Sequence, residues 1–182
     1  FIYLFVLSLI SIFKKNDRNA FLIFIIFHLA NYTAASIGKM KLGLPFDWIN
    51  NETINMYYAA IERSDVEPNF LHIFEKVLSE KYNKVNNSLV LFSQLFSFLA
   101  LFHPFLLIFL MIAYDFFHFL VGLTAGVWFY KWIIVNVIII IFRKEIFKIL
   151  SSFTFKNKII FCFIIILISQ TDRYRPLGWW DL

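Results

Sequence analysis

An unbroken apolar run extends from Pro104 to Phe142 and sets the strongest limit on what this chain can become. A transmembrane helix needs only about 20 apolar residues, so this run is too long for one ordinary span. Gly122, Gly126 and the polar Tyr130–Lys131 pair mark the place where the run breaks into two helices. The apolar residues are continuous and do not alternate, which favours α-helices over a β-barrel.

The composition agrees with a membrane protein. The chain has 182 residues, of which 60% are hydrophobic and only 16% are charged, whereas soluble domains average about 25% charged residues. We therefore predict a single all-α transmembrane domain, a polytopic helical bundle with the lipid bilayer as its first partner. The domain has about six apolar segments, which are residues 1–13, 20–38, 88–102, 104–128, 129–142 and 159–170.

The long polar stretch 39–87 is predicted to form an extracytoplasmic loop with helices of its own. Aromatic and aliphatic residues recur at helical spacing on each side of Glu67–Pro68, which indicates two short amphipathic helices. Such helices either lie on the membrane surface or close as a cap over the spans.

The positive charge of the chain indicates topology. The net charge is +5, and the basic residues gather in short segments beside apolar ones: KKNDRN after the first, and RKEIFK after the fifth. Short loops rich in Lys and Arg stay in the cytoplasm, so both basic loops are predicted inside and the C-terminal tail outside. We expect a bacterial inner membrane and no nucleic acid partner. Phe1 already lies in an apolar segment, which predicts an incomplete N-terminus.

A polar stripe crosses the second segment. His28, Tyr32, Ser36 and Lys39 are spaced by four, four and three residues, which places them on one helix face. A polar stripe is costly against lipid, so this face is predicted to turn toward a protein interior or a wet cavity. Lys39 has two interpretations. It either anchors the helix end at the interface or, if desolvated, acts as a base.

Two further polar residues lie in the middle of the fourth segment. Asp115 and His118 are three residues apart, so they share a helix face and can pair, orienting the imidazole ring. Intramembrane carboxylates mark functional sites, and they also serve as structural links between helices. The histidines have no metal-ligand spacing and Cys162 is the only cysteine, so no metal site is predicted.

Several motifs together resemble the vitamin K-dependent gamma-carboxylase-like membrane domain. They are Ala35–Met40 followed by Asp47–Trp48, then Phe117–His118 with Gly126 and the aromatic-rich 128–132, and the terminal LGWWD. Bacterial members of this family are known as horizontally transferred transmembrane (SdpB-like) proteins. The resemblance covers residues 20–182.

The resemblance implies a site at the outer membrane face. The family's carboxylating members use a lysine as the base toward reduced vitamin K, and the matching residue is Lys39. His118, with Asp115, matches the assisting group. A reduced quinone-like or lipidic ligand would reach the site from the bilayer, and the predicted cofactor-binding residues are His28, Tyr32, Ser36 and Trp48.

A non-enzymatic function remains as the alternative. The chain would then be an accessory subunit of a larger membrane complex, with Lys39 and Asp115 as contacts between helices. The short third, fifth and sixth segments favour this interpretation, because short spans are often sheltered by neighbouring subunits. A transporter or channel is disfavoured, since no inverted repeat is visible.

Overall fold

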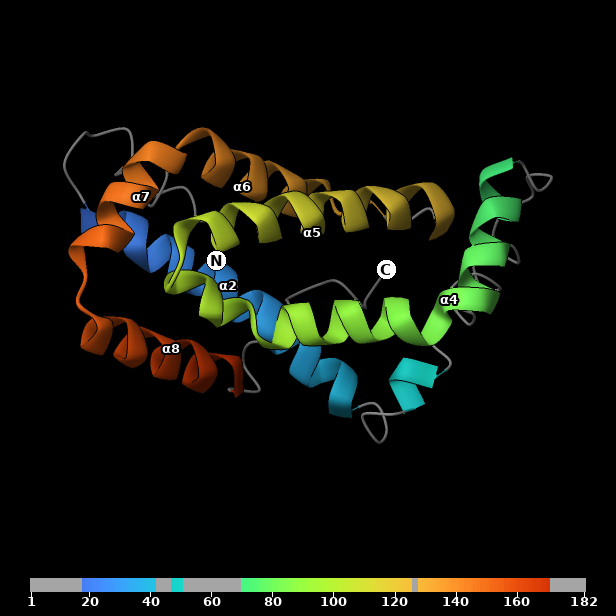
Figure 1. Cartoon of the computed structure of the whole chain (residues 1–182), viewed down its shortest axis with the longest axis horizontal. Helices are drawn as coiled ribbons and strands as arrows, with labels where there is room; N and C mark the ends of the chain where they lie inside the picture. Colours follow the sequence, from blue (N-terminus) through green and yellow to red (C-terminus); the bar gives the residue numbers. More distant parts are fainter. Residues whose placement is uncertain (1–17, 42–46, 51–69, 126–127, 171–182) are drawn as a thin grey trace. The chain divides into compact units, whose positions relative to one another are not determined.

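The computed structural model describes residues 18–41, 47–50, 70–125 and 128–170 (Figure 1). Within these ranges the chain forms helices and short links and no strand, so the predicted all-α class is confirmed for this part of the protein. Residues 47–50 form a helical turn. The other elements, in chain order, are α2 (Arg18–Lys41), α4 (Phe70–Leu95), the 3-10 helix η1 (Ser97–Leu101), α5 (Pro104–Ala125), α6 (Tyr130–Ile141), α7 (Arg143–Ser152) and α8 (Phe155–Gln170).

Two of these helices are long and apolar enough to cross a membrane. They are Phe21–Lys41 in α2 and Pro104–Gly122 in α5. A third crossing is gained if α7 and α8, which meet at a bend of 111°, count as one broken span, and α6 is apolar but shorter. The described residues therefore support two or three crossings, and the predicted six are not confirmed. The first of the six, residues 1–13, lies outside the described residues.

α4 runs without a break from Phe70 to Leu95, where the sequence predicted a short amphipathic helix in the outer loop and a separate span from Ser88. The helix continues because it contains neither glycine nor proline, and Asn and Lys weaken a helix only slightly. The second predicted amphipathic helix and the third apolar segment are thus largely one element. Of the first predicted amphipathic helix only residues 47–50 belong to the described part of the chain.

α7 occupies a stretch that the sequence predicted as a basic loop. Ile146, Ile149 and Leu150 share one face of this helix and are buried, whereas Lys144 and Lys148 are exposed. The prediction was based on the basic residues of this segment and did not use the apolar residues that lie among them at helical spacing. The segment is an amphipathic helix that packs on its apolar side.

The chain forms two compact units. Unit 1 comprises Phe1–Ile37, Gln94–Leu107 and Phe142–Leu182, and thus holds most of α2 with η1, α7 and α8. Unit 2 comprises Gly38–Ser93 and Ile108–Ile141, and thus holds most of α4, α5 and α6. Each unit combines segments that are far apart in the sequence.

Buried hydroxyl groups link the helices of unit 1. The hydroxyl of Ser97 in η1 donates to the Leu29 carbonyl of α2 at 3.0 Å, and that of Ser169 in α8 donates to the Ala30 carbonyl at 3.0 Å. Thr33 lies 3.0 Å from Ser97 through their hydroxyl oxygens. Short hydroxyl side chains let helices approach closely, and they act as polar links where the surroundings are apolar.

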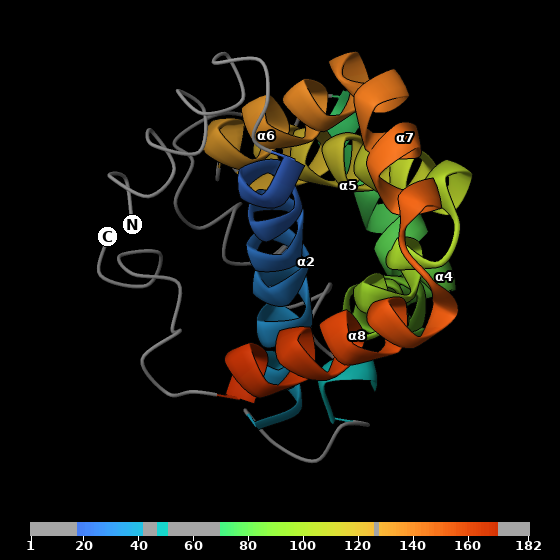
Figure 2. The ribbon, with the colours of Figure 1, turned by 90° about the vertical axis from the view of Figure 1, so that its left-hand side faces the viewer.

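In unit 2, α5 and α6 lie side by side, as Figures 1 and 2 both show. Met111 and Ile139 are fully buried in this unit. The Tyr114 hydroxyl of α5 donates to the Ser93 carbonyl at 2.7 Å, which joins α5 to α4. The helices are thus connected by polar contacts as well as by apolar packing.

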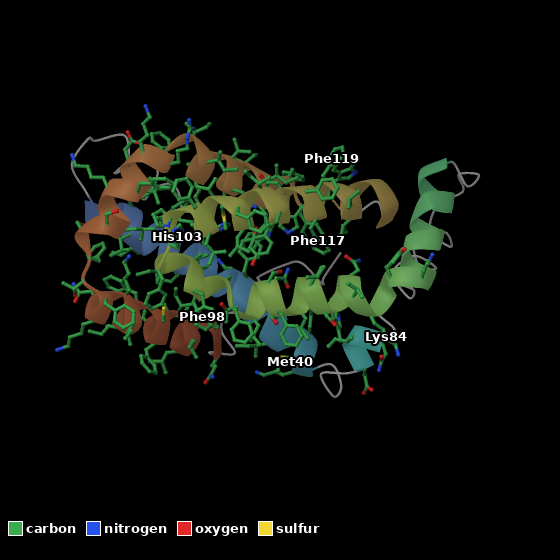
Figure 3. The ribbon with its side chains drawn as sticks, viewed as in Figure 1. Met40, Lys84, Phe98, His103, Phe117 and Phe119 are labelled. Atoms are coloured by element: carbon green, nitrogen blue, oxygen red, sulfur yellow. The ribbon has the colours of Figure 1, made fainter. Side chains whose placement is uncertain are left out.

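Large apolar side chains cover the outside, and uncharged polar ones are placed inside. Figure 3 shows Phe119 and Phe117 on opposite sides of α5, and Phe119 belongs to an exposed stripe. The buried polar residues are His28, Thr33, Ser36, Asn87, Gln94, Ser97, His118, Asn136 and Ser169. Exposed stripes with steps of three and four residues follow α4 (Tyr82, Val85, Leu89, Phe92), α5 (Phe109, Ile112, Phe116, Phe119), α6 (Tyr130, Ile134, Val137, Ile141) and α8 (Ile160, Phe163, Leu167). The rest of the buried core is apolar, and exposed apolar stripes of this extent are unusual on a water-soluble monomer.

Candidate functional site

Lys39 and Trp48, which the sequence predicts as site residues, lie together in unit 2. The Lys39 Nζ atom is 5.3 Å from the centroid of the Trp48 ring, and Trp48 is buried. This is a cation–π contact, which contributes about 0.5–2 kcal/mol depending on how far the pair is desolvated. The amine of Lys39 therefore rests on an aromatic face at the end of α2.

Asn87 holds the turn that carries Trp48. Its Nδ2 atom donates to the Ile49 carbonyl at 2.9 Å and to the Trp48 carbonyl at 3.3 Å, and its side chain is buried. Asn87 is not among the site residues predicted from the sequence. The available signal was its position on α4: Asn87, Leu91 and Gln94 fall on one helix face, and all three are buried.

Asp115 is paired with α6. Its Oδ1 atom accepts a hydrogen bond of 2.6 Å from Nδ2 of Asn136, which is fully buried. The sequence suggested His118, three residues along the same helix, as the partner of this carboxylate. The described contact runs between helices, so Asp115 has a structural role in addition to any chemical one.

His118 sits among aromatic rings. Its imidazole stacks on Phe129 with centroids 5.0 Å apart, and the Trp132 ring lies at 6.5 Å. One turn further along α5, a Cβ atom added at Gly122 would meet the Trp128 ring at 2.6 Å. The absent side chain of Gly122 is what lets Trp128 pack here. The end of α5 therefore holds a buried imidazole in an aromatic setting.

The polar stripe of α2 points inward, as predicted. His28, Tyr32 and Ser36 are all buried. The His28 ring lies edge-on to Tyr32 with centroids 5.1 Å apart, and it stacks on Phe24 at 6.2 Å. These contacts show how the residues pack, and their role in cofactor binding stays a prediction.

The two units divide the predicted site residues. Lys39, Trp48, Asp115 and His118 belong to unit 2, and the stripe residues before Gly38 belong to unit 1. In the described ranges no three His, Cys, Asp or Glu side chains gather to hold a metal ion. Among the residues predicted as catalytic, unit 2 holds one amine (Lys39), one carboxylate (Asp115) and one imidazole (His118).

Comparison with known proteins does not assign this chain to a family. Neither a family model, nor a curated protein, nor a solved structure matches this chain.

Proposed function

We propose that this chain is an integral membrane protein whose helices lie in a lipid bilayer. The exposed apolar stripes carry this proposal. Three phenylalanines of α5, Phe105, Phe109 and Phe116, are 69%, 66% and 64% exposed, while His118 of the same helix is buried. Exposing such stripes to water would be costly, and burying polar groups inward is what a bilayer demands.

The orientation that we propose keeps the basic segments in the cytoplasm of a bacterium. Lys144 and Lys148 are then on the inner side, as the distribution of Lys and Arg in short segments favours. Extraction tests the placement in the bilayer: the chain should remain in the membrane fraction at alkaline pH and leave it only in detergent. Recovery in the aqueous fraction would contradict the proposal.

Within the membrane, we propose that unit 2 carries out proton transfer with a reduced quinone-like or lipidic ligand, in the manner of the gamma-carboxylase-like family. The supporting observation is that Lys39, Asp115 and His118, three groups able to carry a proton, belong to the same compact unit. The neutral amine of Lys39 would take the hydroxyl proton of the ligand, leaving an ammonium ion and an oxyanion.

The Trp48 ring suits the product of that step. A ring 5.3 Å from Lys39 Nζ stabilises an ammonium ion more than a neutral amine. Aromatic surroundings also suit a planar quinone-like ring, and the half-buried rings of Phe129 and Trp132 lie beside His118. The site thus offers a base, a face for the charged base and an apolar environment for the ligand.

The test uses reduced vitamin K as the probe and the purified, reconstituted chain. Lys39→Ala and Lys39→Arg should both abolish turnover of reduced vitamin K. Alanine removes the amine, and arginine keeps the charge over Trp48 but does not act as a base near neutral pH. Lys41→Ala, at an exposed lysine one half-turn away, serves as the matched control and should retain activity. An active Lys39→Arg variant would rule out the base and leave a structural cation.

The exposed phenylalanines of α5 also favour a second candidate function, that of an accessory subunit. A stripe with steps of three and four residues is the pattern by which helices pack on one another. Purification distinguishes the two: obligate co-purification with other membrane subunits favours the accessory role. Isolation of the chain alone with a bound quinone favours the first.

A further inference from the structure

The junction of α7 and α8, which we name the α7–α8 elbow (residues 143–158), concentrates positive charge. It carries five basic residues, Arg143, Lys144, Lys148, Lys156 and Lys158, and one acidic residue, Glu145. Lys144, Lys148 and Lys156 are exposed. A surface with this imbalance attracts anions, and its bound partner should be negatively charged.

The geometry of the elbow matches a membrane surface. α7 and α8 meet at a bend of 111°, so the chain turns sharply between them, and Figure 2 shows the turn. If α8 enters the bilayer, α7 leaves that direction near the surface, where exposed lysines attract anionic headgroups. The apolar side of α7 is buried within the protein, so its lysines, and not insertion of the helix, provide the attraction.

Aromatic contacts hold the elbow to the start of α5 within unit 1. The Phe147 ring lies 5.1 Å from Phe105, and the Phe155 ring lies 5.4 Å from Phe102. Lys158 Nζ donates to the Phe102 carbonyl at 3.4 Å. The basic residues are therefore carried by helices that pack on their neighbours within unit 1.

The surroundings of the elbow distinguish a lipid from a soluble anion. Phe105 and Phe155 are exposed beside the lysines, and the apolar stripe of α8 (Ile160, Phe163, Leu167) begins one turn after Lys156. Segments that bind the membrane interface combine Lys and Arg with Phe and Leu in this way. A ligand with a phosphate head and acyl chains fits both features, whereas free phosphate fits only the first.

We propose that the α7–α8 elbow binds the headgroups of anionic phospholipids. The ammonium groups of Lys144, Lys148 and Lys156 pair with the phosphates, and the acyl chains lie along the exposed stripe of α8. This inference rests on the proposed placement of the chain in a membrane. It adds a lipid class and a location, and it is independent of any catalysis in unit 2.

The test measures lipid binding by the full chain in a neutral detergent, with phosphatidylglycerol and phosphatidylcholine as probes and native mass spectrometry as the readout. Phosphatidylglycerol should bind in preference. The triple variant Lys144→Gln/Lys148→Gln/Lys156→Gln should weaken its binding by roughly tenfold or more, since each lysine near a membrane surface contributes measurably. Glu145→Gln should strengthen it.

A matched control removes the same charge elsewhere. Lys81, Lys84 and Lys131 are exposed lysines of unit 2, and their triple glutamine variant should bind phosphatidylglycerol like the parent protein. Equal losses in both triple variants would show nonspecific attraction and overturn the proposal. Competition by inorganic phosphate or by an oligonucleotide at equal concentration would also overturn it.

A charge-preserving variant guards against misfolding. Lys144→Arg/Lys148→Arg/Lys156→Arg should retain the preference for phosphatidylglycerol, and loss of binding in this variant with its helical content intact would contradict the proposal. The membrane placement and the lipid-binding elbow can be refuted independently. A chain found in the aqueous fraction refutes the membrane placement, whereas a detergent-extracted chain without lipid preference refutes only the elbow.

Discussion

Asn136 of α6 donates a hydrogen bond of 2.6 Å to the Asp115 carboxylate of α5, and the asparagine is fully buried. The Asp115 carboxylate is half-buried, so this donor compensates part of the water that it loses. The bond connects two helices whose outer faces are apolar, so it specifies how they pair. Its removal should therefore be visible in the stability of unit 2.

Asn136→Leu should destabilise the protein by about 0.5–1.5 kcal/mol, the net contribution of a typical hydrogen bond, because Asp115 is only half-buried. Thermal unfolding in detergent measures the effect. Val137→Leu, at an exposed neighbour on α6, is the control and should leave the unfolding temperature unchanged. The double variant Asn136→Leu/Asp115→Leu should recover part of the loss, and an additive double variant would refute the coupling.

Asn87→Ala should release the turn of residues 47–50 from α4. Two hydrogen bonds to the Trp48 and Ile49 carbonyls are lost, each contributing about 0.6 kcal/mol in an apolar environment. Maleimide labelling of Ile49→Cys in a Cys162→Ser background should become faster. Asn86→Ala changes the exposed neighbour and should not alter the rate. Equal rates in all three proteins would show that Asn87 does not hold the turn.

The local features of this chain could be predicted from its sequence, because helical periodicity depends on neighbouring residues. The inward stripe of His28, Tyr32 and Ser36 follows from their spacing alone, and burial of all three confirms it. The helical class follows from continuous apolar runs. The number of spans could not be predicted in the same way, because an apolar segment is not always a separate span. α6 has only 12 residues, and α4 continues through a polar stretch.

Long-range contacts could not be predicted in this way. Asn87 meets the Trp48 carbonyl across 39 residues, and Ser169 meets the Ala30 carbonyl across 139. Nothing in the residues around Asn87 or Ser169 identifies their partners. The Asp115–Asn136 bond is similar, since spacing along α5 favoured His118 as the partner, whereas the pairing of α5 with α6 places Asn136 against the carboxylate.

Ser169→Ala should weaken the attachment of α8 to α2 within unit 1. The Ser169 hydroxyl contacts both the Ala30 carbonyl at 3.0 Å and the Ile165 carbonyl of its own helix at 2.6 Å. We expect a loss of about 0.6 kcal/mol in unfolding free energy, the average for polar links between membrane helices. Ser151→Ala, at an exposed serine of α7, should have no effect. A loss in the control as large as that in Ser169→Ala would contradict the assignment.

Two glycines should respond to alanine in opposite directions. A Cβ atom at Gly122 would lie 2.6 Å from the Trp128 ring, so Gly122→Ala should cost about 1–3 kcal/mol through overpacking. Nothing lies within 4 Å of a Cβ atom at Gly38, so Gly38→Ala should stabilise α2 by about 0.5–1 kcal/mol through helix propensity. Thermal unfolding of the two variants in detergent measures both the loss and the gain of stability in one experiment. Because the clash is with one ring, Trp128→Leu should make Gly122→Ala tolerable, and a Gly122→Ala variant as stable as the parent would show that Trp128 does not pack against this helix.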